Sequence, residues 1–298
     1  MSIAGGYYKA ADAAAEHGMD VVQIFTRNTN QWKAKPLTPE EAQQFSDACA
    51  RHGLRHPIAH ASYLINLASS DTELRRKSVD AMVLELERAD ALGLEGVVVH
   101  PGASMGNSEQ QGLELIVAAL DEVCERLPDG RAKILLENTA GQGTCLGWRF
   151  EHLGFMLERA AQPQRLGVCL DTCHAFAAGY GLATAREYRE TMDELDKHVG
   201  IERVRAWHVN DSKRERGSRV DRHDHIGCGK LGLEPFWRLL RDSRWRHVPK
   251  YLETNKGERN GETYDARNLL VLQTLARQRS FASVPAAIDA IGGLVQEA

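Results

Sequence analysis

The chain has 298 residues, of which 43% are hydrophobic and 26% charged, which is typical of a globular protein with a large core. No apolar run approaches the roughly 18 residues that a membrane-spanning helix needs, and no signal peptide is recognisable, so we expect a cytoplasmic protein. The net charge of −4 gives no overall indication of nucleic-acid binding. However, residues 203–225 hold seven Lys or Arg against four Asp or Glu, which makes this segment either a phosphate-binding loop or a solvated surface loop.

Seven short apolar runs predict buried β-strands, and segments of helix length separate them. The predicted strands cover residues 20–26, 55–60, 96–100, 133–137, 166–171, 203–208 and 248–253. Helix-start and helix-end signals mark the segments between them: Thr38 is a predicted N-cap, and Gly93 is a predicted C-cap. The predicted helices cover residues 7–17, 38–52, 71–92, 108–126, 148–161, 184–199, 233–242 and 265–278.

This alternation of strands and helices predicts a TIM (β/α)8 barrel. Only seven strands are visible, because Gly5-Gly6 is typical of a loop before a helix and no strand precedes it. We therefore expect a single catalytic barrel domain over residues 1–279 that lacks its first strand, or a barrel whose gap the C-terminal tail covers. Residues 280–298 are predicted to form that tail, with a short helix.

Six of the seven predicted strands end on a residue that can bind a metal ion. These residues are His60, His100, Glu137, Asp171, His208 and Glu253. The carboxyl ends of barrel strands meet at one rim, so we expect these side chains to converge there. His174, three positions after Asp171, and the Asp221-Arg222-His223 segment bring the candidates to nine. Nine imidazoles and carboxylates suit zinc or manganese and are enough for three sites of three or four ligands each.

Two cysteines flank Asp171 and offer a thiolate as an alternative ligand. Cys169 is expected to lie deeper in the barrel, and Cys173 follows the strand directly. Buried, inert thiols are the expectation for both, because a structural cysteine in apolar surroundings stays protonated. The metal ligands are therefore predicted to be histidines and acids alone.

Several longer motifs extend this pattern. They are residues 60–66 (HASYLIN), 99–102 (VHPG), 136–143 (LENTAGQG), 167–180 (GVCLDTCHAFAAGY), 208–213 (HVNDSK), 221–223 (DRH) and 252–254 (LET). With these motifs the chain resembles endonuclease IV, the zinc-dependent apurinic/apyrimidinic endonuclease family, from residue 2 to about residue 254. The resemblance implies a hydrolase that cuts the phosphodiester 5′ to abasic sites in duplex DNA and leaves a 3′-hydroxyl and a 5′-deoxyribose phosphate.

The resemblance also implies how nine ligands divide among three zinc ions, with manganese as the alternative at one site. The first ion would be held by His60, His100 and Glu137. Glu137 would bridge to the second, which is completed by Asp171, His208 and Glu253. The third would be held by His174, Asp221 and His223. Paired cations can activate a water molecule and stabilise both oxygens of a phosphodiester displacement, so Glu137 is the predicted catalytic residue.

By the same resemblance, the loops after the strands contact DNA. Tyr63 and Leu64 would wedge into the base stack at the lesion; the alternative is a hydrophobic pair packed under the loop. Asn30 stands where many family members carry arginine, so Gln31 and Lys33 would compensate in part. The predicted phosphate contacts come from the basic loop, where solvated charge is the alternative for each side chain. They are Lys213, Arg214, Arg216, Arg219 and Arg222.

Family members usually have a strand ending in Gly-Ala-His before the segment that matches residues 2–6. We therefore expect that Met1 is an internal codon and that the natural protein starts about ten residues earlier, one strand's length. Two other functions remain open for the same rim: a metal-dependent sugar isomerase-like TIM barrel and a non-catalytic, metal-stabilised barrel. The expected state is a cytoplasmic monomer that associates with the nucleoid through DNA.

Overall fold

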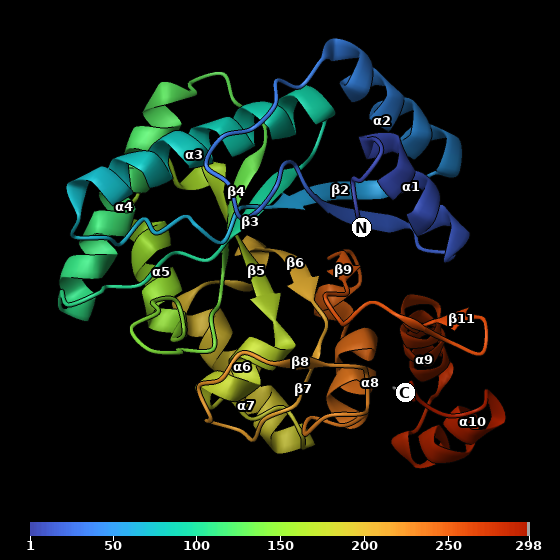
Figure 1. Cartoon of the computed structure of the whole chain (residues 1–298). Coiled ribbons are helices and arrows are strands. Elements are labelled where there is room, and N and C mark those ends of the chain that lie inside the picture. Colours follow the sequence, from blue (N-terminus) through green and yellow to red (C-terminus); the bar gives the residue numbers. More distant parts are fainter. Residues whose placement is uncertain (297–298) are drawn as a thin grey trace.

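The computed structural model describes residues 1–296, and in it seven parallel strands form one nearly closed barrel sheet (Figure 1). The strand order is β1-β2-β3-β4-β5-β6-β9, so strands adjacent in the chain are also adjacent in the sheet. The strands are β1 (Val21–Phe25), β2 (Arg55–His60), β3 (Gly96–Val99), β4 (Lys133–Glu137), β5 (Leu166–Asp171), β6 (Val204–His208) and β9 (Lys250–Tyr251). The predicted seven-stranded TIM barrel is confirmed, although β9 is much shorter than its apolar run.

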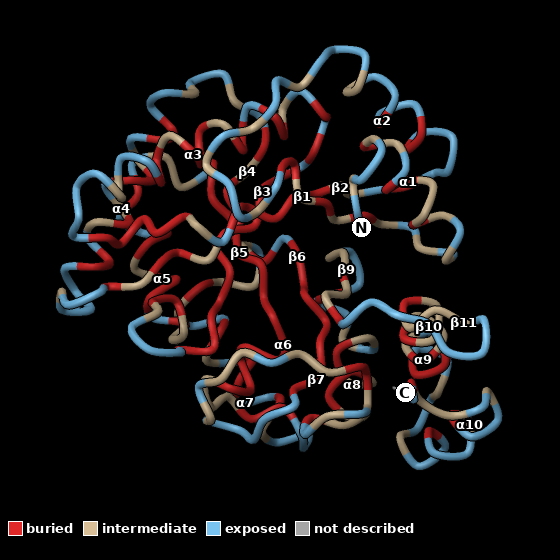
Figure 2. Tube along the Cα trace, in the orientation of Figure 1, coloured by how far each residue is buried: buried red, intermediate tan, exposed pale blue. Residues whose placement is uncertain are grey.

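Helices surround the sheet and bury one face against it, as Figure 2 shows by the red inner and blue outer sides of the trace. They are α1 (Tyr7–Glu16), α2 (Pro39–His52), α3 (Thr72–Leu92), α4 (Glu109–Arg126), α5 (Phe150–Arg159), α7 (Ala185–His198), α8 (Glu234–Arg241) and α9 (Tyr264–Arg277). The sequence did not predict α6 (Thr172–Ala178), which begins directly at the end of β5. None of the described helices is long and apolar enough to span a membrane.

Local signals explain where the helices begin and end. The Thr38 hydroxyl accepts a hydrogen bond from the Glu41 amide, and the Glu41 carboxylate accepts one from the Thr38 amide, which completes a capping box. Gly53 and Gly93 end α2 and α3 in the left-handed region, with φ of 65° and 69°. The predicted N-cap at Thr38 and C-cap at Gly93 are therefore confirmed.

Two apolar layers hold the barrel together. The larger lies between the sheet and the helices. The smaller fills the barrel interior and consists of Ile58, Val98, Leu135, Cys169, Ala206 and Tyr251. These six residues come one each from β2, β3, β4, β5, β6 and β9, so the interior is a packed core below the rim that carries the candidate ligands.

The outer edges of β1 and β9 face each other across a seam in the ring, and no described strand pairs with either edge. Two side-chain hydrogen bonds cross this seam, and the first residue donates to β1 beside it. Gln23 Nε2 donates to Glu253 Oε1 at 2.6 Å, and the Met1 amino group donates to the Gln23 carbonyl at 2.5 Å. The Tyr251 hydroxyl also donates to the His56 carbonyl at 2.5 Å. The seam is therefore joined by the two side-chain hydrogen bonds instead of a β-ladder.

Residues 280–296, the described part of the C-terminal tail, pack on the outside of the barrel and do not cover this seam. The tail contains the helix α10 (Val284–Ala290), which packs beside α9 and away from β1 (Figure 1). Arg267 of α9 donates to the Ile291 carbonyl at 2.5 Å, and the Cys228 thiol lies 3.4 Å from the Val295 carbonyl. Burial of Val284 and Ile288 holds the tail against the outside of the barrel.

Candidate metal centre

The nine candidate ligands gather at the carboxyl-terminal rim of the barrel. Strands end on four of them, and His100 and Glu253 follow β3 and β9 within two residues. The other three come from α6, from the loop between β6 and β8, and from the short strand β8 (His223–Asp224). Glu137, Asp171 and His208 are completely buried, whereas the His100 and Asp221 side chains are about one-third exposed, at 34% and 39%. The rim thus has a buried floor and a partly open wall.

Glu137 lies at the centre of this floor, and its two oxygens face different partners. Oε2 is 3.1 Å from His60 Nε2 and 3.0 Å from His100 Nε2. Oε1 is 2.6 Å from His208 Nδ1, which is also 3.0 Å from Glu253 Oε2. One carboxylate therefore joins two groups of nitrogen and oxygen atoms, each of a size that can hold a metal ion.

A third group lies toward the open wall. Asp221 Oδ2 is 3.2 Å from His174 Nε2, and Asp221 Oδ1 is 3.3 Å from His223 Nε2. The two imidazoles are 3.4 Å apart at these same nitrogens, so three ligand atoms converge. Asp171 lies between this group and the buried one, with Oδ2 3.6 Å from His223 Nε2. All nine candidates are thus brought together, and Asp171 is within reach of two groups.

Charge compensation dominates the electrostatics of the rim. Burial alone would raise the pKa of Glu137, but His208 and His100 hold the pKa of this carboxyl well below its ordinary value. Burial likewise opposes ionisation of Glu253, whose pKa His208 lowers to about 2. Burial would lower the pKa of His174, yet Asp171, Asp221 and Glu137 hold it well above its usual range. So many buried carboxylates need cationic partners, which protonated imidazoles or metal ions can supply.

The two cysteines beside Asp171 are buried near the same ligands. Cys169 lies within reach of Glu137 and His208, and Cys173 within reach of Asp221 and His223. Burial raises the pKa of Cys169 to about 12, and burial also raises the pKa of Cys173 far above its ordinary value. Both side chains therefore favour the thiol form when no metal ion is bound.

Sequence reasoning missed the side chains that hold the ligands in place. Asn210 Nδ2 donates to Asp171 Oδ2 at 2.5 Å, and Asn210 Oδ1 accepts from the Glu253 amide at 2.9 Å. The Asn138 side chain accepts from the Asp171 amide at 2.6 Å and donates to the Asp171 carbonyl at 3.2 Å. The backbone carbonyl of Asn138 lies 2.9 Å from His174 Nδ1, which directs the Nε2 atom of that ring toward Asp221. Each asparagine follows a strand-end candidate ligand within two residues, and this position in the sequence could have identified both as supporting side chains.

The loops that follow β1 and β2 carry four of the predicted DNA contacts, and one buried ion pair lies beneath both loops. Tyr63 is 61% exposed, so it does not pack under its own loop, and Leu64 is partly buried. Asn30 and Gln31 are exposed on the loop after β1. The ion pair joins Arg27 Nε to Glu85 Oε1 at 2.7 Å.

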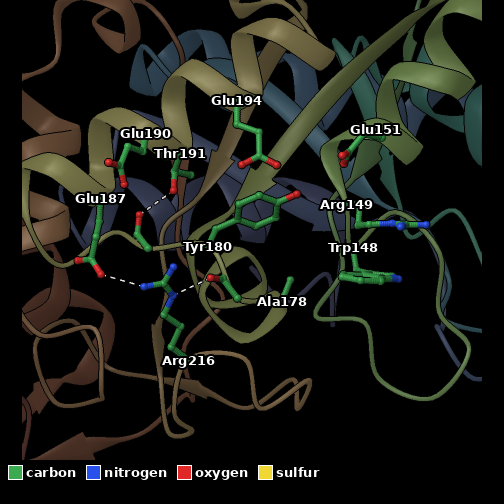
Figure 3. Close-up of a pocket in the computed structure, with 12 residues that line it drawn as sticks. Trp148, Arg149, Glu151, Ala178, Tyr180, Glu187, Glu190, Thr191, Glu194 and Arg216 are labelled. Carbon is green, nitrogen blue, oxygen red and sulfur yellow. Dashed lines mark hydrogen bonds and ion pairs between the residues drawn. The ribbon is translucent and has the colours of Figure 1, made fainter.

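The basic loop divides into exposed and anchored side chains. Lys213 and Arg222 are exposed, and the Lys213 amide donates to the Arg222 carbonyl at 2.9 Å. Arg216 instead donates to the Gly179 carbonyl at 2.6 Å and to Glu187 Oε1 at 2.8 Å (Figure 3). Arg219 lies 4.1 Å from the centre of the Trp148 ring. Arg216 and Arg219 therefore fasten the loop that carries two ligands.

The cavity shown in Figure 3 lies beside this loop and has a volume of about 370 Å³. Four glutamates contribute to its lining, and they are Glu151, Glu187, Glu190 and Glu194. Only two arginines, Arg149 and Arg216, oppose them in the lining, and Arg216 is already paired with Glu187. The excess of negative charge makes this cavity unsuited to phosphate, so it does not extend the candidate site.

Comparison with known proteins agrees with the fold and the motifs. A family model of AP endonuclease 2 type, described as a xylose isomerase-like TIM barrel, matches residues 11–275. A probable endonuclease 4 of Geobacter sp. (strain M21) is 48% identical over 275 residues, covering 92% of this chain and 96% of that protein. One from Chloroflexus aurantiacus (strain ATCC 29366 / DSM 635 / J-10-fl) is 46% identical over 277 residues, with 93% and 96% covered.

Solved structures give the same result. Endonuclease IV from Thermus thermophilus superposes with a TM-score of 0.80 at 39% identity, covering 92% of this chain and 96% of that one. A D-tagatose 3-epimerase-like protein superposes with a TM-score of 0.68 at 22% identity, covering 92% and 95%, and at that identity the likeness concerns the fold alone. The chain belongs to the endonuclease IV family, a family of nucleases of the hydrolase class built on this barrel.

Proposed function

We propose that this chain is a DNA-repair endonuclease that hydrolyses the phosphodiester 5′ to an abasic site in duplex DNA, leaving a 3′-hydroxyl and a 5′-deoxyribose phosphate. The position of Glu137 supports this proposal most directly, because its two oxygens face separate groups of imidazoles at 2.6–3.1 Å. A buried carboxylate shared in this way suits two adjacent cations, and paired cations suit phosphodiester hydrolysis.

The residues fit three zinc ions, because they offer imidazole nitrogen and carboxylate oxygen around a buried excess of negative charge. His60, His100 and Glu137 would hold the first ion. Glu137 would also contact the second, together with Asp171, His208 and Glu253. His174, Asp221 and His223 would hold the third. Manganese is the alternative at one of these sites.

When bound, the cations would lower the pKa of a water molecule and offset the charge of the phosphate. Glu137 would orient this water, because its oxygens lie between the two buried groups. The water oxygen forms a bond to phosphorus while the bond from phosphorus to the preceding 3′ oxygen breaks. That oxygen takes up a proton and becomes the 3′-hydroxyl, so no side chain forms a covalent bond to the substrate.

The exposed side chains around the rim would bind the DNA. Tyr63, exposed beside His60 and His100, would stack at the gap that a missing base leaves. The basic loop would contact phosphates, and its positive charge offsets the acidic surroundings. The proposed contacts are Asn30, Gln31, Tyr63, Leu64, Lys213 and Arg222.

The proposal is tested with zinc-loaded protein and a duplex that carries one tetrahydrofuran abasic analogue. We expect a single incision on the 5′ side, which prolonged chelation abolishes and Glu137→Gln reduces to background. Glu151→Gln removes a half-exposed carboxylate outside the rim and is the matched control, expected to cut at the wild-type rate. An inactive zinc-loaded wild type, or a fully active Glu137→Gln variant, contradicts the proposal. Ketose isomerisation in place of incision would favour the sugar isomerase alternative.

A further inference from the structure

Gln23 is a polar side chain at the rim that is not among the nine candidate ligands. It lies on β1, the strand at one side of the seam, and its side chain reaches residues 185 and 230 positions away. Its Oε1 is 2.7 Å from His208 Nε2, and its Nε2 is 2.6 Å from Glu253 Oε1. One amide therefore contacts two of the candidate ligands at once, on β6 and just after β9.

Chemistry fixes the orientation of this amide. A carboxylate that binds a cation can only accept hydrogen bonds, and Glu253 Oε1 lies 2.6 Å from the Gln23 amide. The Gln23 atom that faces Glu253 must then be the NH₂ group, which leaves the carbonyl oxygen facing His208. A carbonyl oxygen only accepts, so His208 must carry a proton on Nε2.

This arrangement leaves one ligand atom of each partner for a cation. With its proton on Nε2, a neutral His208 has its lone pair on Nδ1, the atom 2.6 Å from Glu137 Oε1. With Oε1 held by Gln23, Glu253 presents Oε2, which is 3.0 Å from the same His208 Nδ1. The two atoms that Gln23 does not contact are thus the two that converge beside Glu137.

We propose that Gln23 is a positioning residue for the second metal ion, selecting the tautomer of His208 and the free oxygen of Glu253. The inference rests on the ligand assignment of the proposed function. An outer partner of this kind commonly changes metal affinity by about 10- to 100-fold when it is removed. Because the first and third groups lack contact with Gln23 among the described hydrogen bonds, the effect should fall on one ion of three.

The test compares Gln23→Met, which keeps the length of the side chain and removes both hydrogen bonds, with Gln43→Met as a matched control. Gln43 lies on the exposed face of α2, where it bonds only to Asp47 within the same helix. Zinc affinity is measured by competition with a chromophoric chelator, and the melting temperature of the metal-free protein is recorded. We expect Gln23→Met to bind one of three zinc ions about 10- to 100-fold more weakly and the other two with wild-type affinity, while the lost seam contact lowers the metal-free melting temperature. Gln43→Met should match the wild type.

A second measurement reads the tautomer directly. Long-range ¹H–¹⁵N spectra of the zinc-loaded wild type should show His208 protonated at Nε2, and Gln23→Met should weaken this preference. Wild-type affinity for all three ions in Gln23→Met overturns the proposal, as does uniform weakening of all three with a lower metal-free melting temperature. A wild type that binds three ions but does not cut abasic DNA overturns the proposed function alone. A wild type that binds no zinc overturns both.

Discussion

Glu85 joins the two rim loops that follow β1 and β2, and its removal should both destabilise the barrel and misplace these loops. Its Oε1 accepts from Arg27 Nε at 2.7 Å and from the Ser62 amide at 3.3 Å, and its other oxygen accepts from the Thr26 hydroxyl. Arg27 in turn donates to the Gln31 carbonyl at 2.6 Å. The side chains of the pair are only 2% and 1% exposed, so water cannot replace a lost partner.

Breaking a buried pair by removing one partner costs about 3–5 kcal/mol, because the remaining charge stays buried without compensation. Arg27 is especially sensitive, since its Nη2 is already buried without a hydrogen-bond partner. We therefore expect Glu85→Leu to lower the free energy of unfolding by about 3–5 kcal/mol. Replacing both partners, as Arg27→Met with Glu85→Leu, should recover much of that loss, because no unpaired charge remains.

Urea unfolding of the metal-free proteins measures this difference in the free energy of unfolding. Initial rates on the abasic duplex give KM and kcat, which report whether the two loops are still positioned to bind DNA. Glu85→Leu should raise KM for the duplex more than it lowers kcat, since Tyr63 and Gln31 lose their support and the ligands do not. A Glu85→Leu variant within about 1 kcal/mol of wild type would refute the reasoning. So would a double variant that is less stable than the single one.

Two further predictions concern protons and salt. The pKa of His208 is raised in the folded protein, so the stability that its protonation contributes is complete below about pH 6.5 and declines as pH rises through the folded value. Calorimetry of the metal-free protein should therefore show a melting temperature that falls above neutral pH. With zinc bound, the melting temperature should fall less. Glu253 has the opposite sign, with stability lost only as pH drops from about 4.5 toward 2, so it cannot cause that decline. Arg222→Ala should reduce the slope of log DNA affinity against log salt concentration by about 1 and leave the melting temperature unchanged. Arg216→Ala should instead lower the melting temperature, because it removes the ion pair with Glu187. Equal slopes for Arg222→Ala and wild type would exclude the phosphate contact.

The strands and the candidate ligands were predictable because the strands are short, mostly apolar runs, and six of the seven runs stop at a charged or imidazole side chain. The last strand, β9, is only two residues long, because only Lys250 and Tyr251 pair with β6. The short helix α6 was missed, since seven residues that begin inside a ligand motif give no helical period to read.

The supporting contacts were beyond sequence reasoning for a different reason. Gln23 meets His208 and Glu253 across 185 and 230 positions, and Arg27 meets Glu85 across 58. Pairings at such separations depend on the closed barrel and leave no local pattern. For Arg216 the sequence pattern was misleading in another way. The basic segment around it indicated phosphate binding, whereas its hydrogen bonds to Gly179 and Glu187 fix the loop to the barrel.

The seam between β1 and β9 makes barrel closure and ligand assembly a single cooperative event. No backbone ladder joins these strands in the described part of the chain, and the contact between Gln23 and Glu253 crosses the seam at the metal centre itself. We therefore expect that parting β1 from β9 breaks no β-ladder and separates Gln23 from the candidate ligand Glu253. A cation that binds only the closed form would stabilise that form, so the fraction of molecules with an open barrel would fall as the cation concentration rises.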